Sequence, residues 1–157
     1  MEDFKKIQEE VIQSGEGARI RLFAYYNQKK WSSEMDVDRL QDACIATGSA
    51  YNIYHFFKQI KGASLKKTED AFVESQNEEY CYYLARYIKG VNIQRLENVV
   101  IDCANPVYMY LFARYVKEAD VQRLWKEVKR SGDKKSIDNF KSNIKMPRTK
   151  KEAQLGL

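Results

Sequence analysis

A repeat of 28 residues runs through most of this 157-residue chain. When the sequence is aligned with itself at that offset, apolar residues recur in the same columns. Three such columns are Val37, Leu65, Ile93 and Val121; Ile53, Cys81, Met109 and Ile137; and Ile60, Ile88, Val116 and Ile144. A fixed period of this length, with helical patterning inside it, is typical of stacked repeat arrays. The sequence therefore predicts an all-α fold, built as a right-handed stack of about five helix–turn–helix repeats.

Start and stop signals divide each repeat into two helices. The first helix opens at a column of short side chains that can accept hydrogen bonds from backbone N–H groups: Asp36, Ser64, Asn92 and Asp120. The second is expected to be capped by a matching column: Ser49, Asn77, Asn105 and Asp133. We expect it to end at Gly62 and Gly90, because glycine readily adopts the left-handed conformation that closes a helix.

The period also predicts the domain organisation. We expect one helical repeat domain over residues 1–147, with repeats at about 4–36, 37–64, 65–92, 93–120 and 121–146. The first repeat carries five extra residues in the connection between Gln28 and Asp36. Residues 148–157 are basic and lack apolar periodicity, which predicts a disordered tail.

Composition narrows the class of protein. Hydrophobic residues make up 44% and charged residues 31% of the chain, which is ordinary for a globular domain. No apolar run approaches the roughly 18 residues of a membrane span, so we expect a cytoplasmic protein without a membrane partner. Cys44 and Cys81 occupy apolar columns and Cys103 lies in a turn, which argues against a disulfide framework or a zinc site.

The pattern of residues in the repeat resembles that of known families of helical repeats. Helical hairpins of this kind are similar to the HEAT and armadillo class of α-solenoids. They resemble more closely the short repeats of some bacterial and phage proteins, in a pattern carried here by residues 47–50, by Tyr110, residues 112–114 and Lys117, and by residues 89–93. The resemblance covers nearly the whole chain. It implies a scaffold and no particular activity.

A helical wheel of the second helices predicts one outward face. On this wheel the columns of residues 54, 58 and 61 point away from the apolar columns. They repeat Tyr-x3-basic-x2-Lys in three successive repeats and supply our candidate partner-binding residues: Tyr54, Lys58, Lys61, Tyr82, Arg86, Lys89, Tyr110, Arg114 and Lys117. Tyrosine offers a stiff contact area, and arginine a planar fork for carboxylate or phosphate.

Two structural interpretations compete with this one. The lysines complement the helix dipole at a C-terminus, and each arginine can stack on the tyrosine four residues before it. Trp31, in the inserted connection, and Trp125, in a column otherwise filled by Gln41, Glu69 and Glu97, are secondary interface candidates. Trp125 and its column are expected to point outward on the first helix, and both tryptophans are more simply explained by packing.

The sequence gives little support to catalysis. His55 is the single histidine, and no phosphate loop, HExxH, CxxC or G-x-S-x-G motif is present, so we expect no enzyme, cofactor, metal or small-molecule substrate. The favoured hypothesis is a binding protein, an adaptor or inhibitor, that engages an acidic surface of a partner protein. The alternative is a nucleic-acid-binding protein that uses the same cations and the basic tail. A third possibility is that these nine residues only support the fold. Binding would then use the concave side of the stack or the inserted connection between Gln28 and Asp36.

Overall fold

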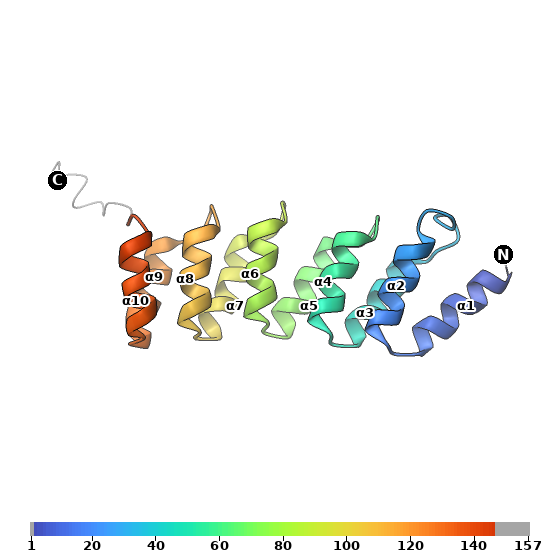
Figure 1. Ribbon diagram of the computed structural model, residues 1–157, viewed down its shortest axis with the longest axis horizontal. Coiled ribbons are helices and arrows are strands. Elements are labelled where there is room, and N and C mark those ends of the chain that lie inside the picture. The colour runs from blue at the N-terminus through green and yellow to red at the C-terminus, as the bar shows by residue number, and fades with distance from the viewer. Residues whose placement is uncertain (1, 147–157) are drawn as a thin grey trace. The chain divides into compact units, whose positions relative to one another are not determined.

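The computed structural model describes residues 2–146, which form ten α-helices and no strand (Figure 1). The helices are α1 Glu2–Gln13, α2 Gly17–Asn27, α3 Val37–Ala46, α4 Ala50–Gln59, α5 Leu65–Glu74, α6 Glu78–Tyr87, α7 Ile93–Asp102, α8 Pro106–Tyr115, α9 Val121–Ser131 and α10 Lys134–Asn143. This confirms the all-α helical-repeat fold. The predicted tail, 148–157, lies outside the described residues.

The chain divides into two compact units, Met1–Ser75 and Gln76–Leu157. In each unit, helices that are neighbours in sequence pack together, and second helices also pack on second helices: α2 on α4, α6 on α8, and α8 on α10. The second helices are therefore covered on more than one side. The expectation that residues 1–147 fold cooperatively as one domain stays a prediction.

In each unit, residues of two repeat columns form the centre of the core. The column of first helices comprises Leu40, Thr68, Leu96 and Leu124, and that of second helices comprises Phe56, Leu84, Phe112 and Phe140. Each of these eight side chains has a relative exposure of 0%. Val100 and Val116 are also buried, as the 28-residue register predicts.

The predicted caps are present in most repeats. Asp36, Ser64, Asn92 and Asp120 each accept a hydrogen bond from a backbone N–H of the first turn, as Asn77, Asn105 and Asp133 do at the second helices. Ser49 is an exception, because its Oγ instead accepts a hydrogen bond from the Asn52 side chain at 2.9 Å. Gly62 and Gly90 have positive φ, but α4 and α6 end before them, at Gln59 and Tyr87.

The turn inside each repeat requires one residue in the left-handed conformation. Its φ is 65° at Gly15, 69° at Gly48, 51° at Gln76, 56° at Ala104 and 73° at Gly132. Three repeats supply glycine, and two force a residue with a Cβ into a region that L-amino acids disfavour by roughly 1–2 kcal/mol.

Ala104→Gly is expected to raise the free energy of unfolding by up to about 1 kcal/mol. The relief of left-handed strain exceeds the extra freedom that glycine gains in the unfolded chain, about 0.4–1 kcal/mol. Urea unfolding followed by circular dichroism measures the change. Ala71→Gly, inside α5, is the matched control and should cost roughly 1 kcal/mol. A loss of stability in the 104 variant would contradict the proposed strain.

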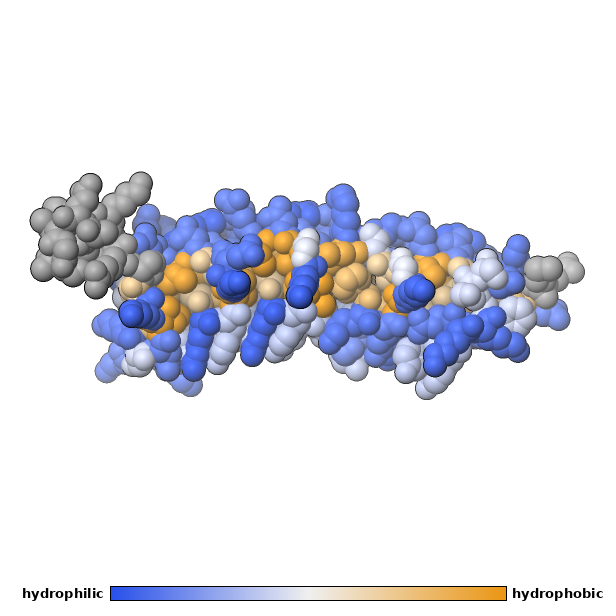
Figure 2. Space-filling model, turned by 90° about the horizontal axis from the view of Figure 1, so that it is seen from above, coloured by the Kyte–Doolittle hydropathy of each residue, from blue (hydrophilic) through white to orange (hydrophobic). Residues whose placement is uncertain are grey.

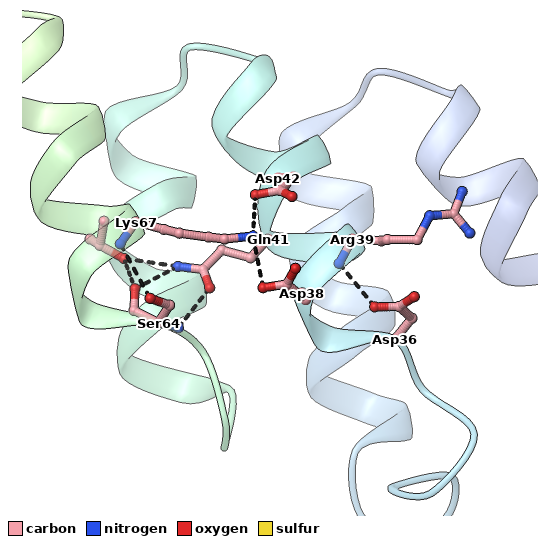
Figure 3. Close-up of polar contacts among 8 residues, drawn as sticks. Asp36, Asp38, Arg39, Gln41, Asp42, Ser64 and Lys67 are labelled. Carbon is pink, nitrogen blue, oxygen red and sulfur yellow. Dashed lines mark hydrogen bonds and ion pairs between the residues drawn. The ribbon is translucent and has the colours of Figure 1, made fainter.

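A column of buried polar residues lies on the first helices. Gln41, Glu69 and Glu97 are 2%, 8% and 2% exposed, which corrects the prediction that their column points outward. Gln8, which precedes Gln41 by the longer spacing of the first repeat, is 4% exposed. Gln41 Oε1 accepts a hydrogen bond from the Ser64 backbone N–H at 2.7 Å, and its Nε2 donates to Ser64 O and Thr68 Oγ1 (Figure 3). In the same way Gln8 accepts from the Asp36 N–H, and Glu97 from the Asp120 N–H. We call Gln8, Gln41 and Glu97 the clamp residues, because each holds the backbone at the start of the next repeat.

Glu97 makes stability depend on pH. Burial raises the pKa of Glu97, although the Asp120 N–H and the Arg123 guanidinium oppose this shift. The folded state therefore binds the proton more tightly than the unfolded state, and the free energy of unfolding falls as pH rises from the ordinary glutamate pKa through the raised one. Glu97→Gln keeps the acceptor and should remove this fall. Urea unfolding between pH 4 and 8 measures it.

Asp102→Asn, which neutralises an exposed carboxylate on the same helix, is the charge-matched control for Glu97→Gln. The assignment is wrong if the wild type gains stability relative to the Glu97 variant as pH rises.

Candidate partner-binding surface

The structure places the nine candidate partner-binding residues in two different environments. The six cations, Lys58, Lys61, Arg86, Lys89, Arg114 and Lys117, are exposed as predicted. The three tyrosines are not: Tyr54, Tyr82 and Tyr110 are only 6%, 2% and 7% exposed. The prediction that the tyrosines point outward is therefore wrong, and their rings belong to the core.

Contacts between neighbouring second helices explain the burial of Tyr82 and Tyr110. The Tyr82 ring on α6 lies 6.1 Å from the Tyr108 ring on α8, and the Tyr110 ring on α8 lies 6.3 Å from the Phe140 ring on α10. A wheel drawn for one helix has a single buried direction, whereas α8 is packed from both sides. Burial is also the main cause that raises the pKa of Tyr82, so its hydroxyl stays neutral.

The buried tyrosine hydroxyls orient the exposed arginines. Arg86 Nη1 donates a hydrogen bond to Tyr82 OH and Arg114 Nη1 donates to Tyr110 OH, both at 2.5 Å. The predicted stacking of each arginine on the tyrosine four residues earlier is also present, at 5.8 and 5.9 Å from the ring centroids. In the other unit Lys58 Nζ lies 5.3 Å from the Tyr54 centroid. These cations thus have a structural role, and their positions are fixed by the core.

Two further tyrosines, which the sequence reasoning missed, complete the surface. Tyr87 and Tyr115 follow the arginines directly and are 55% and 41% exposed. The Arg86 guanidinium lies 4.9 Å from the Tyr87 centroid and 4.2 Å from that of Tyr115, and Arg114 lies 5.0 Å from Tyr115. The tripeptide Ala-Arg-Tyr at 85–87 and 113–115 was the available signal.

Because both arginines contact the Tyr115 ring, their guanidinium carbons are no more than about 9 Å apart. In the described part of the chain, neither guanidinium forms an ion pair with a carboxylate, and neither do Lys89 and Lys117. Other basic residues are neutralised locally. Lys67 Nζ lies 2.7 Å from both Asp38 and Asp42 (Figure 3), and Arg39 pairs with Glu9. The two arginines therefore concentrate charge that the described residues do not neutralise.

A groove of about 540 Å³ adjoins Arg86. It lies where α6 ends, between the α6–α7 and α8–α9 connections. Its apolar residues include Ile88, Val91 and Val116, and the charged side chains of Lys89, Lys117 and Glu118 also line it. Figure 2 looks onto the side of the molecule at which α6 and α8 end, and shows hydrophobic surface interrupted by hydrophilic side chains. A ligand here would meet apolar surface and positive charge together.

The remaining candidates have packing roles. The Trp31 ring stacks on Phe4 at 4.8 Å, and the Trp125 ring lies 5.0 Å from Phe140. Trp125 is half-buried in the column of the clamp residues, where an indole cannot accept a backbone N–H. The His55 ring lies 4.3 Å from Tyr51, and its pKa is lowered by burial and then by Arg21 and Lys58.

Residues 2–146 contain no group of three or more His, Cys, Asp or Glu side chains placed to hold a metal ion. None of the helices in this range combines the length and apolar character of a membrane span. Comparison with protein-family models, with curated proteins and with solved structures finds no match.

Proposed function

We propose that this chain is a non-enzymatic α-solenoid of the HEAT and armadillo-like class, made of short repeats, that binds an acidic surface of a partner protein. The contact residues would be Arg86, Arg114, Lys89 and Lys117, with Lys58 and Lys61 in the other unit. Such a protein would act as an adaptor, or as an inhibitor that occupies a site on its partner.

The observation that carries this proposal is a pair of oriented arginines without a carboxylate partner in the described residues. A guanidinium has five N–H donors in a planar fork, and only one donor is given to the tyrosine hydroxyl. The others remain available to a carboxylate. Because hydrogen bonds and rings already restrict both side chains, binding would cost less conformational entropy than it does for mobile lysines.

The ring contacts favour a protein over a nucleic acid. Proteins that bind single strands stack bases on the faces of exposed aromatic rings. Here guanidinium groups lie over the Tyr87 and Tyr115 rings, so a base would have to displace them. A carboxylate would bind only the outer edge of each guanidinium, so it would leave the guanidinium on the tyrosine ring.

Replacing Arg86 and Arg114 with alanine tests the proposal. Fluorescence anisotropy would follow a labelled oligoglutamate peptide and a labelled oligothymidylate strand. We expect at least about tenfold weaker binding of the acidic peptide, since charged bidentate contacts are lost. Stability should fall by roughly 1 kcal/mol per site, because each arginine also covers a tyrosine. Arg86→Lys/Arg114→Lys should retain part of the affinity, because lysine keeps the positive charge but lacks the planar fork of N–H donors.

The matched control is Lys134→Ala/Lys141→Ala, which removes two exposed cations from α10 and should change affinity by no more than about twofold. Oligothymidylate that binds more tightly than the acidic peptide, with affinity falling steeply and linearly in log salt, would favour the nucleic-acid alternative. If the alanine pair is destabilised and yet binds the acidic peptide normally, the arginines serve only packing.

A further inference from the structure

An apolar stripe runs along the exposed side of α8. Val107, Leu111 and Tyr115 follow one another at intervals of four residues, so they share one side of the helix. Val107 is 52% and Tyr115 41% exposed, and Leu111 is half-buried. On α6, Tyr83 and Tyr87 occupy the same two repeat columns as Leu111 and Tyr115. This side of α6 and α8 therefore exposes apolar side chains.

The two stripes form one face because α6 and α8 are packed neighbours. In Figure 1 these two helices stand in front of α7 and α9, so the side away from α7 and α9 is open to solvent. Of the four large apolar side chains exposed in the described part of this unit, three lie on this face: Tyr87, Val107 and Tyr115.

Charge is unequal along the face. Arg86 and Arg114 stand at its end near the C-termini of α6 and α8. Glu78 and Glu79 occupy the first turn of α6 at the other end, and Tyr83 OH donates a hydrogen bond to Glu79 at 2.9 Å. A ligand that matches this face is therefore apolar along one side and acidic at one end.

We propose that this face binds an amphipathic helix of a partner protein, antiparallel to α6 and α8, with acidic residues in its first turn over Arg86 and Arg114. This rests on the proposed function, and it specifies the partner segment. Asp and Glu are favoured at a helix N-terminus, and in this orientation that end lies beside the negative ends of the α6 and α8 dipoles.

The helical backbone of this face favours a bound partner segment that is a helix over one that is an extended strand. An extended peptide gains affinity by hydrogen bonding to an open sheet edge, and residues 2–146 contain no strand. A helix satisfies its own backbone and offers apolar side chains at intervals of three and four residues. The stripe from Val107 to Tyr115 spans about 12 Å, which matches two to three turns of a bound helix. A segment this short is unstable alone in water, so it folds as it binds.

Selection of random peptides by mRNA display on the full chain tests the inference. Enriched sequences should carry Asp or Glu followed by apolar residues at i, i+3 or i+4, and i+7. The best synthetic peptide should gain helical circular dichroism when the chain is added. Tyr87→Ser/Val107→Ser should weaken its binding at least about tenfold in fluorescence anisotropy, since two central apolar contacts are lost.

The matched control is Leu22→Ser/Tyr26→Ser, which removes similar exposed side chains, 38% and 73% exposed, from α2. It should leave affinity within about twofold. Thermal melts monitored by circular dichroism establish that each variant is folded before its affinity is compared.

The other outcomes separate the two proposals. Enriched peptides that are acidic without helical periodicity, or whose acidic residues follow the apolar ones, overturn the helix inference while the acidic-partner function stands. Peptides that bind Arg86→Ala/Arg114→Ala as well as they bind the wild type overturn the proposed function. A lack of enrichment, or equal losses in the α2 control, overturns the helix inference.

Discussion

Phe112→Ala is expected to lower the free energy of unfolding by about 3–5 kcal/mol, because it removes a buried aromatic ring and leaves a cavity. Phe112 lies on α8, which packs on α6, α7, α9 and α10, and its side chain is 0% exposed. No single neighbouring helix can close the space. Urea unfolding followed by Trp125 fluorescence in a Trp31→Phe background reports on the same unit, since Trp125 lies on α9.

Val107→Ala on the same helix is the control, and it should cost less than about 1 kcal/mol because Val107 is 52% exposed. If the two variants lose similar stability, then the register of α8, and with it the 28-residue alignment, is wrong.

Gln41→Ala is expected to cost about 2–3 kcal/mol, although it removes a polar side chain. The Ser64 N–H loses its acceptor and Ser64 O loses one donor, while a cavity opens beside the buried Thr68. The Ser64 N–H is half-buried, and a donor shielded from water that is left without a partner costs more than its hydrogen bond contributed. Guanidinium chloride unfolding followed by Trp31 fluorescence, in a Trp125→Phe background, measures the loss.

Asp42→Ala, one residue along α3, is the control for Gln41→Ala. Among residues 2–146, Asp42 makes only an exposed ion pair with Lys67, so the expected cost is below about 1 kcal/mol. An unchanged free energy of unfolding in the Gln41 variant would mean that water replaces the clamp at no cost.

Most of the fold could be predicted because it depends on local signals. The apolar columns fixed the register, and the caps at Asp36, Ser64, Asn92 and Asp120 lie where the sequence predicts them. The left-handed turn was harder to recognise at Gln76 and Ala104, because those residues are not glycine. At these two positions the turn follows from the alignment of the repeats and not from the type of residue.

The burial of individual side chains could not be predicted as well. Tyr82 is polar at one end and was assigned to the surface, but the face it occupies is covered by α8. Glu97 looked like a solvated charge, yet it accepts a hydrogen bond from a backbone N–H 23 residues later. Contacts between repeats bury both side chains, and a helical wheel of one helix does not represent those contacts.

The exposure of the candidate residues was predicted in part. The six cations are exposed as the sequence predicts, whereas Tyr54, Tyr82 and Tyr110 are buried. Tyr87 and Tyr115 stand beside the arginines in the sequence, but their contact with both guanidinium groups depends on the distance between α6 and α8. Their role in binding stays a prediction.

The clamp residues have a consequence for how such chains change in length. Gln8, Gln41 and Glu97 each bind a main-chain N–H, at residues 36, 64 and 120. Every residue except proline supplies that group, so this hydrogen bond does not depend on which side chain follows. A copied or deleted repeat would offer its new neighbour the same hydrogen-bond partner without compensating substitutions. This makes the array modular, and whole repeats could be exchanged between chains that share the clamp.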